Sequence, residues 1–272
     1  MRDKDLIYQL KKRVSLMLEH NNKIPLKTIS SISGFSIKHT QKLFAKQTGM
    51  TINKYIRRSI LSKAAILLVL TRKSILDISI DVGYSSQQSF SRAFKKEFLL
   101  PPIRYRERGV LDMLTTLKDY NLNHKFIYVG KIYLPAIKLR ALYIRFTDTL
   151  LDDGNIKFRK DRLRIIKEAL SCNKSVFVAY LLKPTQKKQN KVFVDTFFCY
   201  ATAKGKDTII GGGEYWVIKF KGSLADYISL ARNIVFVINK PLSLKVIEKF
   251  EMLNENNIDI KIYLPCISHK MV

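Results

Sequence analysis

The sequence has little cysteine and histidine, and neither residue is arranged for chemistry. The three cysteines, Cys172, Cys199 and Cys266, form no CxxC motif or other paired spacing, so we expect neither a disulfide framework nor a zinc site. The four histidines are scattered along the chain without a ligand pattern. We therefore expect no metal and no cofactor.

Long apolar runs are also missing. The longest, 64–70, is far shorter than the roughly 20 residues with which a helix crosses a bilayer. The N-terminus is charged at Arg2, Asp3, Lys4 and Asp5, and no apolar signal segment follows. We expect a soluble protein in a reducing cytoplasm, without a membrane partner.

Acidic residues are scarce relative to basic ones. The 272 residues include 49 Lys/Arg and only 22 Asp/Glu, a formal net charge of +27. The excess is denser in residues 1–108, with 22 basic and 7 acidic residues, than in 109–272, with 27 and 15. Such a field favours polyanions, nucleic acid first and an anionic membrane second. A lysine-rich composition that only solvates surfaces is the alternative, and the length indicates two domains more readily than one.

The most informative stretch runs from Ile78 to Phe98. Its pattern predicts a short apolar helix, a turn at Gly83 and a second helix capped by Ser85 or Ser86. One face of the second helix is apolar and is expected to be buried: Phe90, Ala93, Phe94 and Phe98. The opposite face combines amides, a hydroxyl and cations without a carboxylate: Gln87, Gln88, Ser91, Arg92 and Lys95.

This polar face suits DNA better than water. Glutamine pairs with adenine edges, arginine with guanine edges, and lysine with phosphates. A merely solvated helix face is the alternative. We interpret the stretch as a helix-turn-helix whose second helix reads bases in the major groove.

An earlier stretch, 24–44, has the same design. Gly34 marks a turn after a short apolar helix, and Ser36 caps the helix that follows. The spacing i, i+3, i+4 places three polar residues of that helix on one face: Lys38, Gln41 and Lys42. This stretch is interpreted as another helix-turn-helix.

The two stretches form an internal repeat. Gly34-Phe35-Ser36 matches Gly83-Tyr84-Ser85 forty-nine residues later. Between them, 51–71 predicts one long helix capped by Thr51, with a buried stripe: Ile52, Tyr55, Ile56, Ile60, Ala64, Leu67 and Leu68. A packing helix is also expected over 5–20, with Leu6, Leu10, Val14, Met17 and Leu18 on one side.

A longer motif extends the second unit. The segment 75–98 reads I-L-D-I-x4-G-Y-x-S-Q-Q-S-F-S-R-A-F-K-K-x-F and is followed by Pro101-Pro102-Ile103-Arg104-Tyr105-Arg106. Together they resemble the AraC/XylS family of bacterial transcription regulators, and within it the MarA–SoxS–Rob group. The resemblance covers roughly residues 5–108 and is far more specific than a bare helix-turn-helix.

The resemblance implies which residues face DNA. By position, the base-facing residues fall on Lys38, Gln41 and Lys42 in the first unit and on Gln87, Gln88, Ser91 and Arg92 in the second. The capping serines Ser36, Ser85 and Ser86 can also bind phosphates at helix N-termini, and Lys95 and Lys96 complete the candidate DNA-binding set.

The first unit departs from the group. Lys38 replaces the usual tryptophan and Lys42 the usual arginine, whose bidentate fork a lysine cannot make. We favour base contact for Lys38, Gln41 and Lys42, and contact with phosphates alone remains open. Thr40 replaces a core leucine, which suggests a looser first unit.

The pattern changes after residue 109. We expect a linker over 110–124 and an α+β domain with a mainly antiparallel sheet over 125–272. The expected strands are 125–131, 137–146, 175–182, 192–202, 211–222 and 258–264, and the expected helices are 155–171 and 223–238. Leu163, Ile166 and Leu170 are expected to face inward, and 239–257 is a less regular stretch.

Three motifs in this half resemble the GyrI-like effector-binding domain: His124-Lys125-Phe126, Gly212-Gly213-Glu214-Tyr215-Trp216 and Lys261-Ile262-Tyr263-Leu264-Pro265. The order of the two domains resembles the Rob branch of the group. The resemblance implies a ligand pocket, for which the candidates are Tyr143, Trp216, Tyr227, Lys261 and Tyr263. Aromatic residues on strands are, however, more often part of a core. Such domains usually carry a glutamate where this chain has Lys261, so a lipophilic cation is not expected as the effector.

The sequence thus predicts an N-terminal all-α domain, 1–109, with two helix-turn-helix units joined by a long helix, followed by a C-terminal α+β GyrI-like domain. We expect a sequence-specific transcription regulator of promoter DNA, an activator that contacts RNA polymerase by family resemblance, located in the cytoplasm at the nucleoid. A non-specific architectural DNA-binding protein is the alternative, because a charge of +27 would hold any DNA at low salt. A hydrolase ranks last, since 125–272 shows no nucleophile–base or carboxylate pair and no catalytic residue is assigned.

Overall fold

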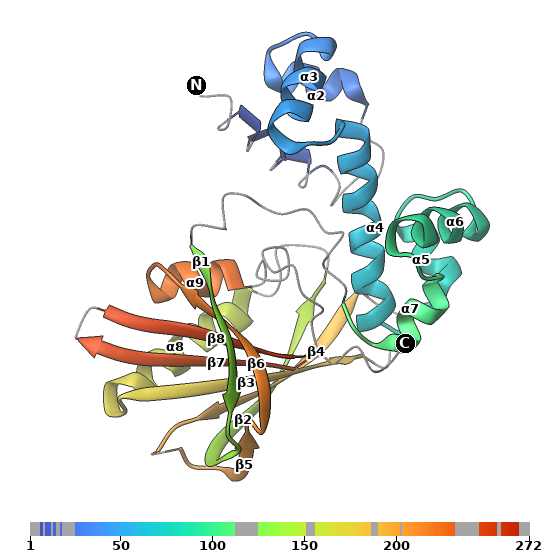
Figure 1. The fold of residues 1–272 in the computed structure, drawn as a ribbon. Helices are drawn as coiled ribbons and strands as arrows, with labels where there is room; N and C mark the ends of the chain where they lie inside the picture. Colours follow the sequence, from blue (N-terminus) through green and yellow to red (C-terminus); the bar gives the residue numbers. More distant parts are fainter. Residues whose placement is uncertain are drawn as a thin grey trace. The chain divides into compact units, whose positions relative to one another are not determined.

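The computed structural model describes residues 6–7, 9–11, 13–14, 17, 25–111, 125–150, 156–185, 190–201, 203–231, 245–254 and 257–266. The chain forms two compact units, one built of helices and the other around a β-sheet (Figure 1). Within the described ranges, no helix combines the length and the apolar character needed to cross a membrane.

The helical unit contains α2 (Leu26–Ser33), α3 (Ile37–Thr48), α4 (Ile52–Leu70), α5 (Ile75–Asp81), α6 (Gln87–Phe98) and α7 (Pro102–Arg108). Ahead of them, the described residues of the expected opening helix are helical. Leu6, Leu10 and Val14 are buried, as predicted, whereas Leu18 lies outside the described residues.

Each of the two helix pairs, α2–α3 and α5–α6, turns at a glycine. Gly34 and Gly83 have φ values of 71° and 82°, a region that side chains disfavour. The next helix starts at a serine whose hydroxyl accepts a backbone N–H: Ser36 from His39 at 3.3 Å and Ser86 from Ser89 at 3.2 Å. Ser86, and not Ser85, is therefore the cap of α6.

The long helix α4 carries both helix pairs. The seven residues of its predicted stripe are all buried, and Thr51 caps it by accepting the N–H of Lys54 at 3.2 Å. The ring of Tyr55 packs edge-on against Phe44 of α3 with centroids 5.3 Å apart. Arg58 pairs with Glu97 of α6 at 2.5 Å, with both side chains mostly buried.

Thr40, which stands where a core leucine was expected, lies within the α2–α3 pair. Its side chain is buried, and its hydroxyl donates to the carbonyl of Ser36 at 3.0 Å and shares a hydrogen bond with the Ser33 hydroxyl at 2.7 Å. A buried hydroxyl is costly only when it lacks a partner, so this polar substitution is accommodated.

The sheet unit is one antiparallel sheet with the strand order β1-β6-β8-β7-β3-β4-β2-β5, in which every neighbouring pair is antiparallel. The strands are β1 (Phe126–Leu134), β2 (Ile137–Thr149), β3 (Ser175–Pro184), β4 (Lys191–Cys199), β5 (Lys206–Ile210), β6 (Gly213–Phe220), β7 (Lys245–Asn254) and β8 (Asn257–Pro265). The helices α8 (Ile156–Cys172) and α9 (Leu224–Leu230) complete the unit.

Two of these strands were not predicted. β7 falls in the stretch described as less regular, because charged residues occur on both of its faces and include the buried Glu248. β5 is a short edge strand on β2 in which only Ile210 is buried, so its sequence lacks the usual apolar alternation. The predicted strand 192–202 ends at Cys199. The linker residues 112–124 and residues 232–238 of the predicted last helix lie outside the described residues.

The inward face of α8 differs from the prediction at one position. Ile166 and Leu170 are buried as expected, but Leu163 is only half-buried and Arg162 lies on the buried face instead. Arg162 ion-pairs with Glu248 of β7, and this pairing explains how a charged residue takes an inward position. At the start of α8, Phe158 packs on Phe146 of β2 with ring centroids 4.5 Å apart.

Candidate nucleic-acid interface

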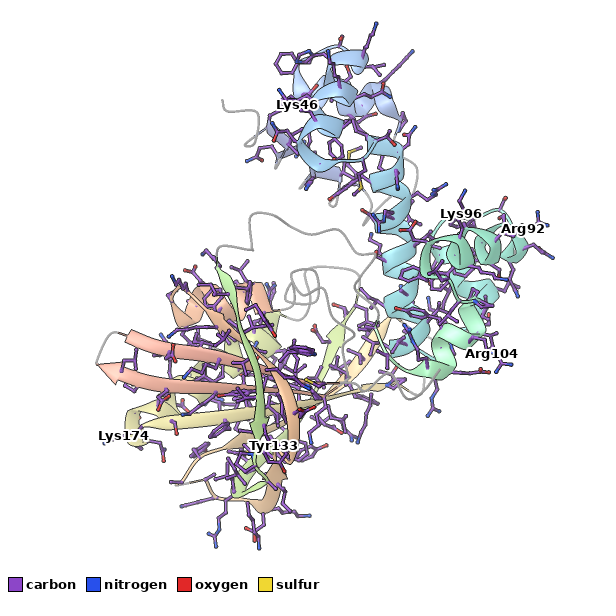
Figure 2. All side chains as sticks on the ribbon, in the orientation of Figure 1. Lys46, Arg92, Lys96, Arg104, Tyr133 and Lys174 are labelled. Carbon is purple, nitrogen blue, oxygen red and sulfur yellow. The ribbon has the colours of Figure 1, made fainter. Side chains whose placement is uncertain are left out.

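The predicted reading face lies on α6. Gln87, Gln88, Arg92, Lys95 and Lys96 are exposed, and Ser91 is half-buried. The opposite side of α6 is fixed by aromatic packing: Phe94 is fully buried and its ring lies 4.4 Å from that of Phe98 and 5.2 Å from that of Tyr105 in α7. Arg92 and Lys96 project from α6 in Figure 2.

The cations of this face are not neutralised by neighbouring carboxylates. In the part of the chain that the structure describes, Arg92, Lys95 and Lys96 have no ion-pair partner. The carboxylate of α6, Glu97, is directed to Arg58 of α4 instead. An exposed helix face with amides and cations is suited to an anionic partner that offers hydrogen-bonding groups.

The corresponding face of α3 is exposed as well. Ser36, Lys38 and Lys42 are exposed and Gln41 is half-buried. Lys46 follows one turn after Lys42, is exposed, and is labelled in Figure 2. Sequence reasoning left Lys46 out of the candidate set, although Lys46 precedes Lys96 by fifty residues, as Phe44 precedes Phe94, and this correspondence was the available signal.

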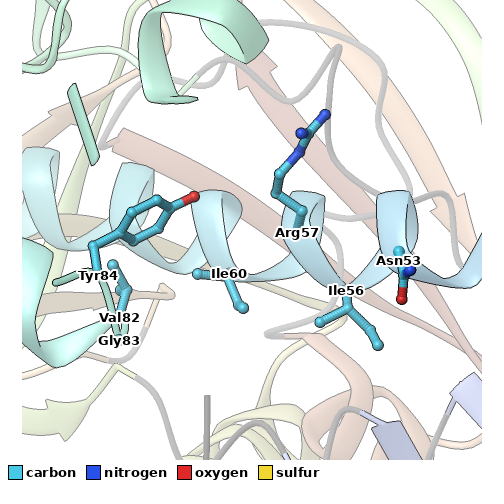
Figure 3. Close-up of a pocket in the computed structure, with 7 residues that line it drawn as sticks. All are labelled: Asn53, Ile56, Arg57, Ile60, Val82, Gly83 and Tyr84. Carbon is cyan, nitrogen blue, oxygen red and sulfur yellow. The ribbon is translucent and has the colours of Figure 1, made fainter. Parts of the chain in front are cut away.

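A shallow hollow lies beside the turn before α6 (Figure 3). It is lined by Asn53, Ile56, Arg57 and Ile60 of α4 and by Val82, Gly83 and Tyr84 of the turn. Burial raises the pKa of Tyr84, against the opposing effect of the Arg57 guanidinium. Arg57 is exposed, so it adds a cation beside the turn before α6, and the sequence had not singled it out.

The five candidate pocket residues of the sheet unit are not brought together. By strand alternation and register, Tyr143, Lys261 and Tyr263 belong to one sheet face and Trp216 to the other. Tyr227, on α9, packs its ring 5.1 Å from Phe220 and 5.7 Å from Phe250 on the Trp216 side.

Lys261 has a partner within its own strand. Its ammonium group lies 3.1 Å from Asp259, which also pairs with Lys219 at 2.5 Å. Burial opposes the charge of Asp259, but the two ammonium groups outweigh it and lower the pKa of Asp259. Lys219 and Lys249 are the cross-strand neighbours of Lys261, and Lys249 pairs with Glu251.

Comparison with known proteins agrees with the helical unit. Residues 29–108 match the family model described as a helix-turn-helix domain. A putative HTH-type transcriptional regulator, YkgA of Escherichia coli, is 41% identical over 115 residues, which are 42% of this chain and about half (47%) of that relative. The transcriptional regulator Rob of Salmonella typhimurium is 43% identical over 83 residues, 30% of this chain and 29% of that protein.

A third relative aligns over most of the chain. The F1 operon positive regulatory protein of Yersinia pestis is 30% identical over 241 residues, which cover 86% of this chain and 79% of that protein. The fold and the exposed face of α6 define a helix-turn-helix DNA-binding protein. The chain belongs to the AraC family of DNA-binding transcription regulators and resembles its MarA–SoxS–Rob group.

Proposed function

We propose that the protein is a sequence-specific regulator that inserts α3 and α6 into successive major grooves of one duplex. The observation that carries the proposal is the exposed polar face of α6, whose opposite side is anchored in the core by buried phenylalanines. The helix α4, with its 19 residues, is about 28 Å long at a rise of about 1.5 Å per residue. That length is compatible with grooves roughly 34 Å apart.

The side chains divide by role. Gln87, Gln88, Ser91 and Arg92 would contact base edges, and Lys95 and Lys96 would contact phosphates. Ser36, Ser85 and Ser86 would contact phosphates at the helix N-termini. In α3 the base-contacting candidates are Lys38, Gln41 and Lys42, with contact to phosphates alone as the alternative.

Arg92→Ala is expected to weaken binding to the specific site by about 1–3 kcal/mol, or roughly 5- to 150-fold, because arginine pairs with a guanine edge. Binding to a scrambled duplex should fall much less. The measurement is a titration of both duplexes with wild type and variant at one fixed salt concentration.

Lys96→Ala is the matched comparison for Arg92→Ala, since both remove one exposed cation of α6. A phosphate contact should lower the affinity for both duplexes by the same factor. Equal losses on the two duplexes for Arg92→Ala as well would show that Arg92 contacts phosphates only, and would favour an architectural protein.

The remaining parts of the proposal follow the family. We divide the chain into a DNA-binding domain, 1–109, a linker, 110–124, and a GyrI-like domain, 125–272. Activation is supported by the relative whose name describes positive regulation of an operon, and RNA polymerase as partner follows from the family resemblance alone. Such a protein would act in the cytoplasm at the nucleoid.

We further propose that the GyrI-like domain senses an effector or a protein partner, and that an effector would be anionic or neutral and polar. Among the described residues, Lys219, Lys261 and Lys249 have only Asp259 and Glu251 as ion-pair partners, so this cluster carries an excess of positive charge. A lipophilic cation would meet repulsion there.

Lys261→Glu is expected to abolish binding of an anionic effector by reversing the charge of this cluster. Calorimetric screening of the full chain would compare matched cationic and anionic amphiphiles on wild type and variant. Tight binding of the cations by the wild type would refute the anionic assignment. No binding in either set would favour a surface for a protein partner.

A further inference from the structure

The sheet unit contains a buried charge cluster under its helices that the DNA-binding role does not use. Arg162 of α8, Tyr180 of β3, Tyr227 of α9 and Glu248 of β7 are all at least nine-tenths buried. Four separate elements therefore meet at one carboxylate. A buried carboxylate requires a cation and hydrogen-bond donors around it.

The groups around Glu248 are arranged as a receptor for one cation. Tyr227 donates to Oε1 of Glu248 at 2.5 Å, and Tyr180 donates to Oε2 at 2.8 Å. Both hydroxyls supply hydrogen-bond donors, which a buried carboxylate requires. Arg162 binds Oε2 through Nη2 at 2.5 Å.

The two tyrosine rings complete the receptor. The guanidinium carbon of Arg162 lies 5.1 Å from the ring centroid of Tyr180 and 5.4 Å from that of Tyr227. A cation over the faces of aromatic rings is attracted by them, and proteins use aromatic cages to bind organic cations. Burial opposes the charge of Arg162, but Glu248 and the two tyrosines raise the pKa of Arg162 above its usual value.

The fit between Arg162 and this receptor is incomplete. Only one nitrogen of the guanidinium contacts the carboxylate, and Nε of Arg162 is buried with no hydrogen-bond partner among the described residues. A guanidinium that binds a carboxylate in the bidentate manner makes two parallel N–H···O hydrogen bonds. Glu248 and the two tyrosine rings instead interact with Arg162 mainly through its positive charge.

We propose that Glu248, Tyr180 and Tyr227 form a binding site for guanidinium-type cations, whose occupant in the native chain is Arg162. The arginine acts as an intramolecular ligand that holds α8 on the sheet. A free cation can enter only after Arg162 has been removed, so the native domain binds no cation at this position. The site is separate from the proposed effector-sensing role, and its test measures neither DNA binding nor regulation.

The test uses the full chain with Arg162→Ala and N-ethylguanidinium, which replaces the atoms that the substitution removes. Thermal unfolding is followed by the fluorescence of Trp216, the single tryptophan, which lies on β6 in the same unit. We expect N-ethylguanidinium in the millimolar range to raise the unfolding temperature of Arg162→Ala in a saturable way, as a ligand of the native state does. Wild type and Arg164→Ala, which removes an exposed arginine of the same helix, should show no such increase.

Two further comparisons decide the result. N-ethylurea has the same shape without the charge and should not raise the unfolding temperature of Arg162→Ala. The variant Arg162→Ala/Glu248→Gln should not respond to N-ethylguanidinium. If Arg162→Ala is unfolded when isolated, recovery of its far-ultraviolet circular dichroism by N-ethylguanidinium is the expected result. Equal responses to the cation and the urea, a response by wild type, or no response by Arg162→Ala would each overturn the proposal.

Discussion

Raising the salt concentration from about 50 to about 200 mM is expected to weaken DNA binding by this protein by about 10³- to 10⁵-fold, if it neutralises roughly six to ten phosphates. Each neutralised phosphate releases condensed counterions, and added salt opposes that release. The cations of α3 and α6 are available to neutralise phosphates. Among the described residues these cations have no ion-pair partner: Lys38, Lys42, Arg92, Lys95 and Lys96.

The salt dependence also tests which lysines are responsible. Lys95→Ala/Lys96→Ala should reduce the slope of log affinity against log salt by about 2, or about 1 for each phosphate that the variant no longer neutralises. The control is Lys157→Ala/Lys160→Ala, which removes two exposed lysines of α8 and changes the net charge equally. A similar reduction by both double variants would mean that overall charge, and not the face of α6, determines binding.

Arg162→Met is expected to lower the free energy of unfolding of the sheet unit by about 3–5 kcal/mol, since it leaves a buried carboxylate without its cation. Arg162 and Glu248 expose only 7% and 5% of their side chains, so little solvent screens the remaining charge. Urea unfolding followed by the fluorescence of Trp216 measures the change within this unit.

The matched control for this prediction lies two residues along the same helix. Arg164 pairs with Glu168 at i, i+4 with both side chains about 60% exposed, and Arg164→Met should cost no more than about 0.5 kcal/mol. Adding Glu248→Gln to Arg162→Met should recover much of the stability, because the buried charge is then gone. Equal costs for Arg162→Met and Arg164→Met would contradict the role assigned to the buried pair.

The helical unit could be read from the sequence because its signals are local. The glycine turns, the serine caps and the three- to four-residue spacing of Phe90, Phe94 and Phe98 act within one or two helical turns. Even so, the choice between Ser85 and Ser86 as the cap required backbone geometry.

The sheet unit was harder to predict from the sequence, because the contacts that stabilise it join residues far apart in the chain. Lys245–Asn254 forms a central strand although it contains Lys245, Glu248, Lys249 and Glu251. Glu248 is tolerated inside only because residues 21, 68 and 86 positions away in the sequence supply its partners. For the same reason the sequence alone did not show that Trp216 and Tyr227 lie on one side of the sheet and that Lys261 and Tyr263 belong to the other.

The central claim is that this protein distinguishes DNA sequences. The most direct measurement selects a preferred duplex from a random pool and then compares its affinity with that of a scrambled duplex from about 50 to about 200 mM salt. We expect the selected sequences to contain two half-sites about one helical turn apart, and the preferred duplex to keep its lead across the range while both affinities fall. A pool without an enriched sequence, or a lead that vanishes at moderate salt, would contradict the account and leave an architectural protein.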